Sequence, residues 1–200
     1  MSTPGRLGID IAEADGNGML DYRQAIERLG ILVVLGDHDP HIAGTLPLGI
    51  DVPGSDIDIL CHAPDANAFT RLVWTAFGNQ PGFSIRQWTG EERPVIASFE
   101  AHGRAVELFG HPSPVRLQRG WRHFEIERRL LALGGALFRH AVMERRRRGA
   151  RTEPAFADSL HLKGDPYASL LEIHSLDDRQ LSRLLAESGF VPFRPSARPD

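Results

Sequence analysis

The stretch of sequence that decides the fold is Ile42–Leu60, IAGTLPLGIDVPGSDIDIL, in which a Gly-Thr pair precedes two aspartates that flank one isoleucine. Residues 56–60 are predicted to form a strand. Because side chains alternate between the faces of a strand, Asp56 and Asp58 point the same way, about 7 Å apart. Two neighbouring carboxylates repel each other unless a cation or a proton intervenes. Such oxygen ligands suit Mg²⁺, which proteins often hold through one or two carboxylates plus substrate phosphates. The pattern therefore predicts a metal and phosphate site.

Composition describes an ordinary globular protein. The chain has 200 residues, 42% hydrophobic and 24% charged, which is enough for one sizeable core or two small packed subdomains. Its 23 basic and 26 acidic residues give a net charge of −3, which argues against coating nucleic acid through the overall field. The sequence has no long apolar run, no secretory pattern and a single cysteine. We therefore expect a cytoplasmic protein without a membrane span.

The first half of the chain mixes strand and helix signals. The segment 1–18 is rich in glycine and acidic residues, so we expect it to be loosely ordered. Asp65 is a predicted N-cap for a helix that buries Phe69 and Phe77. The run 31–35 could be helix or strand. The remaining predicted elements are a helix at 22–29 and strands at 40–44, 83–88, 95–99 and 104–109.

Helical signals replace strand signals from residue 115 onward. We expect helices at 117–133 and 136–148 with a hinge at Gly134-Gly135. Three shorter helices are predicted to begin near Thr152, Asp165 and Asp177, and Gly189 is a plausible stop for the last. The predicted class is α+β, with a core at 19–114, a helical half at 115–190 and a loosely ordered tail at 191–200.

Three segments together resemble a known family. Gly44-Thr45, ten residues and then Asp56-Ile57-Asp58 is similar to the signature of polymerase-beta-like nucleotidyltransferases. With VELFGHP near residue 106 and RTEPAFADSLHLKGDPYASLL at 151–171, it resembles a bacterial family, domain of unknown function 4269, of that superfamily. The resemblance covers residues 20–175. It implies a small mixed sheet flanked by helices, two Mg²⁺ (or Mn²⁺) ions, a nucleoside triphosphate such as ATP, and a third carboxylate on a neighbouring strand.

Glu107 matches that third carboxylate. It alternates with Val106 and Leu108 on a predicted strand, so its charge needs a partner such as a metal ion or an arginine, for instance Arg104. Gly44, Thr45 and Ser55 are the expected nucleotide-binding residues, since a Gly turn offers backbone N–H groups to phosphates.

The loop between these motifs departs from the family pattern. Pro47, Gly49, Pro53 and Gly54 predict a rigid loop, in place of the helical turn common in active members.

Three further features have two readings each. Cys61 is either a small buried residue or a nucleophile, and we favour burial. The segment 37–41, DHDPH, is either a turn before a strand or a histidine metal site, and we favour the turn. The arginines at 145–148, together with Arg151, either stabilise a helix C-terminus or reach a triphosphate, with Arg122, His123 and Arg129 as weaker candidates.

The sequence thus predicts a Mg²⁺-dependent nucleotidyltransferase with catalytic Asp56, Asp58 and Glu107 and an acceptor that cannot be read from it. The alternatives are a catalytically weak nucleotide-binding or antitoxin-like interaction protein with the same fold, and a metal-dependent phosphohydrolase. The oligomeric state is not predicted.

Overall fold

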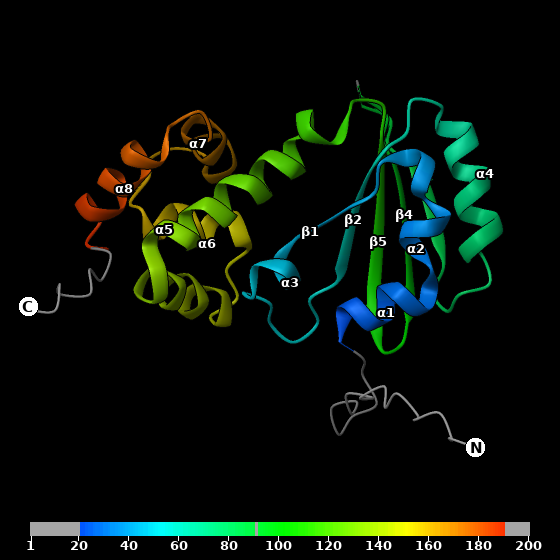
Figure 1. Cartoon of the computed structure of the whole chain (residues 1–200), viewed down its shortest axis with the longest axis horizontal. Helices are drawn as coiled ribbons and strands as arrows, with labels where there is room; N and C mark the ends of the chain where they lie inside the picture. Colours follow the sequence, from blue (N-terminus) through cyan, green and yellow to red (C-terminus); the bar gives the residue numbers. More distant parts are fainter. Residues whose placement is uncertain (1–20, 91, 191–200) are drawn as a thin grey trace, which may run out of the picture.

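A five-stranded mixed sheet forms one half of the protein (Figure 1). The computed structural model describes residues 21–90 and 92–190. The strand order is β1-β2-β5-β4-β3; β2 and β5 run parallel, and the other neighbours are antiparallel. The strands are β1 (His41–Ala43), β2 (Ile57–His62), β3 (Ser84–Gln87), β4 (Val95–Ala101) and β5 (Arg104–His111). All five predicted strands are confirmed within a few residues. The predictions for 1–18 and 191–200 lie outside the described residues.

Three helices cover one face of this sheet. Apolar side chains of β2, among them Ile57 and Ile59, pack there against Phe69 and Val73 in a first core. The Asp65 carboxylate accepts hydrogen bonds from the N–H groups of two residues in the first turn of α4, which confirms the predicted cap. The helices of this half are α1 (Tyr22–Leu29), α2 (Ile31–Val34), α3 (Thr45–Leu48) and α4 (Ala66–Phe77), with a 3-10 turn, η1, at Gly36–His38.

The segment between Gly44 and Asp56 is not the loop that its prolines and glycines predict. Residues 45–48 form the helical turn α3, with Pro47 at its third position. The first N–H groups of a helix have no intrahelical acceptor, so a proline there removes no helical hydrogen bond. The prediction of a rigid loop is therefore wrong for these four residues.

The carboxyl half is helical throughout its described part (Figure 1). The two helices predicted at 117–133 and 136–148 are confirmed as two helical segments of α5 (Arg119–Arg147) that meet at a kink, where Gly135 has φ 62° and ψ −156°. Only glycine adopts these backbone angles without strain, so the predicted hinge is confirmed. The elements of this half are η2 (Val115–Leu117), α5 (Arg119–Arg147), α6 (Thr152–Ser159), α7 (Pro166–Ile173) and α8 (Asp178–Glu187).

The caps of the three short helices differ from one another. Asp165 and Asp177 each accept a hydrogen bond from a first-turn N–H group, and Asp177 forms a capping box with Gln180. Thr152 is not a cap: it is the first residue of α6, and Arg151 precedes it without a side-chain hydrogen bond. Gly189, at φ 92°, follows the C-cap of α8, as predicted.

A second core joins the helical half to the sheet. Leu60 of β2 packs into it with residues of α5, α6, α7 and α8, including Leu130, Phe138 and Phe156. The Gln118 side chain, just before α5, donates a hydrogen bond of 3.0 Å to the Cys61 carbonyl oxygen. No helix within residues 21–90 and 92–190 is long and apolar enough to cross a membrane.

Candidate active site

Strand alternation brings the predicted acids to the sheet face opposite the first core. Ile57 and Ile59 are buried in that core, so Asp58 between them faces the other way. Asp58 lies in register with Glu107, because β2 and β5 are parallel neighbours. Asp56 is two residues before Asp58, immediately ahead of β2. The three acids therefore come from two adjacent chain segments.

Gly44 lies directly against the Asp58 carboxylate. Its φ is 72°, and a Cβ atom added to it would lie 1.9 Å from the Asp58 Oδ2 atom. The antiparallel register of Ala43 with Asp58 sets this close approach. Glycine is thus required at this position for two reasons: the backbone angles disfavour other residues, and the Asp58 carboxylate leaves no space for a Cβ atom.

A cleft of about 620 Å³ opens beside these residues. Five of the six predicted site residues line it: Gly44, Thr45, Ser55, Asp56 and Asp58. Glu107 instead lines an adjoining cavity of about 210 Å³, to which Asp58 also contributes. Asp58 therefore lies on the wall between two spaces.

The surroundings of Asp58 favour its protonated form. Burial, followed by the charges of Asp56, Glu107 and Glu153, raises the pKa of Asp58 to about 7. Burial and Asp56 also raise the pKa of Glu107, which Arg86 partly lowers. A cation would relieve these repulsions, and the oxygen-only donor set fits Mg²⁺ or Mn²⁺.

Arginines of the helical half contribute to the same cleft. Arg146 and Arg151 both line the cleft. Arg146 also donates to the Ala150 carbonyl oxygen, and Arg145 to the Ala141 carbonyl oxygen. Arg145 and Arg146 thus bond to backbone carbonyl oxygens near the end of α5, in keeping with a structural role. The reading that an arginine reaches a triphosphate stays a prediction.

Other cationic candidates have structural partners. Arg129 binds the Asp178 carboxylate and the backbone oxygens of His174 and Leu176, so it fastens α5 to the segment before α8. Arg148 pairs with Glu144 one turn earlier.

Cys61 and the segment 37–41 follow the readings that we favoured. Cys61 is fully buried, and burial raises the pKa of its thiol to about 12. In the segment 37–41, Asp39 has a left-handed turn conformation and accepts a hydrogen bond from His41. The His38 ring donates to the His62 carbonyl oxygen, so it holds the turn against β2.

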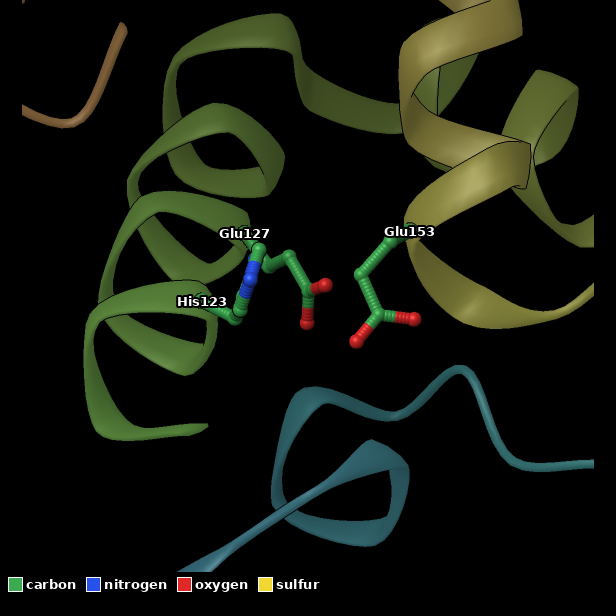
Figure 2. A group of neighbouring side chains, drawn as sticks. All are labelled: His123, Glu127 and Glu153. Carbon is green, nitrogen blue, oxygen red and sulfur yellow. The ribbon is translucent and has the colours of Figure 1, made fainter. Parts of the chain in front are cut away.

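A second group of titratable side chains lies in the same cleft, and the sequence did not predict it. His123, Glu127 and Glu153, which we call the helical cluster, each have a possible ligand atom within 4.8 Å of the others (Figure 2). Burial and nearby arginines lower the pKa of His123 to about 4. Burial raises the pKa of both glutamates, that of Glu127 strongly. The one sequence signal is the spacing of four between His123 and Glu127 on a helix.

Comparison with known proteins finds a matching family. The model of a family described as "Domain of unknown function (DUF4269)" matches residues 24–173. No curated protein sequence matches the chain.

Solved structures share the fold at low sequence identity. A GLD-2/RNP-8 complex chain aligns with a TM-score of 0.50 and 14% identity over 83% of this chain and 74% of that chain. The Cid1 poly(U) polymerase bound to MgGTP gives 0.52 and 10% over 80% of this chain and 50% of that chain. A Cid1 structure described by its RNA terminal uridylyl transferase activity gives 0.50 and 11%, over 76% and 46%. The chain therefore shares the fold of these structures and spans about half the length of the Cid1 chain.

Proposed function

The chain belongs to the DUF4269 family, and we propose that it is a Mg²⁺-dependent nucleotidyltransferase that moves a nucleoside monophosphate from a nucleoside triphosphate to an acceptor. The observation that carries the proposal is that Asp58, two residues after Asp56, lies in register with Glu107 and lines a cleft that Arg146 and Arg151 also line. Acids and arginines that line one open cleft suit a substrate that binds both a cation and phosphates. We assign the acids to a core at 19–114 and the arginines to a helical half at 115–190.

Each site residue has a role in this proposal. Asp56 and Asp58 hold the cation, with Glu107 as the third acid. Gly44 and Thr45 receive the terminal phosphates. When bound, Mg²⁺ or Mn²⁺ neutralises charge that develops on the transferring phosphate.

Hydroxyl and guanidinium groups complete the phosphate site. The Ser55 hydroxyl already accepts a hydrogen bond of 3.0 Å from the Val52 N–H, so its own proton is available to a phosphate oxygen. Arg146 and Arg151 bring two positive charges to the leaving pyrophosphate. These groups orient the triphosphate and stabilise charge, which are the main contributions that phosphoryl transfer needs.

The acceptor would enter from the adjoining cavity. That cavity joins Asp58 to Glu107, and the raised pKa of Glu107 makes it a better base near neutral pH than an ordinary glutamate. In the reaction, an acceptor oxygen forms a bond to the α-phosphorus, the bond to the bridging oxygen breaks, and pyrophosphate leaves. Glu107 takes the acceptor proton.

The test measures pyrophosphate and phosphate separately by mass spectrometry. The full-length chain is incubated with Mg²⁺ and ATP, then with GTP, CTP and UTP, and water serves as the surrogate acceptor. Asp56→Asn and Glu107→Gln should each lower pyrophosphate release at least about 100-fold. The matched control is Asp51→Asn, an exposed aspartate of the same loop, which should retain the wild-type rate.

Two outcomes would replace the proposal. Titration calorimetry that detects Mg²⁺-dependent ATP binding without pyrophosphate release would indicate the nucleotide-binding or antitoxin-like interaction protein. Release of orthophosphate instead, by attack of water on the γ-phosphorus, would indicate a phosphohydrolase that uses the same acids.

A further inference from the structure

The helical cluster is separate from the acids of the sheet. His123 and Glu127 are four residues apart on α5, so they share one face of that helix. Glu153 approaches them from the first turn of α6. Figure 2 shows the three side chains converging across the gap between these helices. Two successive helices thus bring one imidazole and two carboxylates together.

The cluster contains buried polar atoms without partners. Glu127 is 4% exposed and His123 is 8% exposed, and both line the cleft. Neither the Glu127 Oε1 atom nor the His123 Nδ1 atom has a hydrogen-bond partner in the described structure. Buried polar atoms in native proteins are almost always bonded, so unpaired ones that face a cleft point to a ligand.

Arg146 does not satisfy this cluster. It is close enough to lower the pKa of both glutamates, yet it forms no ion pair with either among the described residues. Its Nε atom is itself buried without a partner. Arg151 adds a second positive charge that lowers the pKa of Glu153. Neither guanidinium bonds to the Glu127 Oε1 atom or the His123 Nδ1 atom, so both atoms still lack a direct partner.

We propose that His123, Glu127 and Glu153 bind one divalent transition-metal ion, with one nitrogen and two oxygen ligands. Imidazole together with carboxylates favours Zn²⁺ or a similar ion over Mg²⁺, which prefers oxygen ligands alone. Zinc–ligand bonds are about 2.0 to 2.2 Å long and zinc sites are tetrahedral, so two ligand atoms on one ion lie about 3.4 Å apart. Separations within 4.8 Å can shorten to that distance by side-chain rotations.

The proposed ion has an open coordination position toward the cleft. Three protein ligands plus a position for water or substrate is the arrangement of catalytic zinc sites, whereas structural sites use four protein ligands. The cleft also contains Asp58, whose pKa Glu153 helps to raise, so the two sites are within electrostatic reach. The cluster binds its ion without a nucleotide, and this inference does not depend on nucleotidyl transfer.

The test is Zn²⁺ uptake by the metal-stripped full-length chain in the absence of nucleotide. Equilibrium dialysis with elemental analysis should find one equivalent of Zn²⁺ in the wild type. His123→Gln and Glu153→Gln should each weaken binding at least about tenfold. His140→Gln replaces an exposed histidine of the same helix and should leave binding unchanged. Thermal melting in EDTA verifies that each variant is folded.

A double variant of Asp56→Asn and Asp58→Asn separates the two sites and should retain the zinc equivalent. Substitution with Co²⁺ gives an independent reading, because its visible absorption should change in His123→Gln and not in the double variant. The inference is overturned if the wild type takes up no Zn²⁺. In that case Glu127 and Glu153 share a proton and bind no metal ion. The inference is equally overturned if uptake survives both cluster substitutions or disappears in the double variant.

Discussion

Replacing Asp58 with asparagine should stabilise the metal-free protein, and the gain should grow with pH. The folded-state pKa of Asp58 is about 7, against an ordinary value of 3.8, mainly because of burial and secondly because of Asp56. A raised carboxyl pKa means that the folded state binds the proton more tightly than the unfolded chain. The contribution of protonated Asp58 to the free energy of unfolding is therefore fully present below about pH 4, and it is lost as pH rises to about 7.

The size of the effect follows from the shift. Each unit of pKa difference corresponds to about 1.4 kcal/mol. Between pH 5 and pH 8 ionisation of Asp58 should lower the wild-type free energy of unfolding by about 3 kcal/mol, a change that the Asp58→Asn variant escapes. For a chain of this size that amounts to a difference in melting temperature of roughly 6 to 12 °C. Asparagine keeps the side-chain shape beside Gly44, so packing does not obscure the comparison.

The assay is urea denaturation in EDTA at several pH values between 5 and 8, with wild type, Asp58→Asn and the exposed control Asp51→Asn in parallel. The difference between Asp58→Asn and wild type should widen with pH, while the control follows the wild type. A difference that stays constant across this range would refute the reasoning, because Asp58 would then be satisfied as an ion by the protein itself. Pyrophosphate release with Mg²⁺ should change in the opposite sense and fall in the stabilised variant.

Three further predictions concern Gly44, Cys61 and Arg146. Gly44→Ala should lower the free energy of unfolding by about 3 kcal/mol in urea denaturation, because its Cβ atom would collide with the Asp58 carboxylate. Gly54→Ala, which has a positive φ but no atom within 4 Å of the added Cβ, should cost roughly 1 kcal/mol. Cys61 should react with a thiol reagent at pH 8 only in unfolded protein, since burial raises its pKa to about 12; rapid reaction of the folded protein would contradict this. Arg146→Gln should lower the melting temperature in EDTA by several degrees at pH 8 and less at pH 5, since both glutamates of the helical cluster lose the charge that favours their ionised form. Equal losses at the two pH values would argue for a packing role alone.

Local signals in the sequence were sufficient for the strands and most caps. Because side chains alternate along a strand, the burial of Ile57 and Ile59 on one face places Asp58 on the other, independently of tertiary contacts elsewhere. Asp65 caps α4 because its carboxylate reaches N–H groups two and three residues later. Pro47 misled the prediction, since a proline in the first turn of a helix and a proline in a loop look alike without the backbone angles.

The site depends on contacts that no local pattern contains. The position of Glu107 on its strand could be predicted, but its cavity is formed where Gly120 of α5 packs against β2 and β5. His123 and Glu127 share a readable helical spacing, whereas Glu153 joins them only through the packing of α6 on α5. The predicted roles of Asp56, Asp58 and Glu107 stay predictions until activity is measured.

The bend at Gly135 lets both segments of α5 contribute to one cleft. Glu127 and Arg146 lie on opposite sides of it and are 19 residues apart, a separation of about 28 Å along a straight helix. In the protein both line the same cleft, so α5 returns on itself as two arms of a hairpin. The number of residues on each arm therefore determines which side chains face the cleft. Deleting one residue from either arm would turn every later side chain on that arm by about 100° and carry Arg146 or Glu127 away from the cleft.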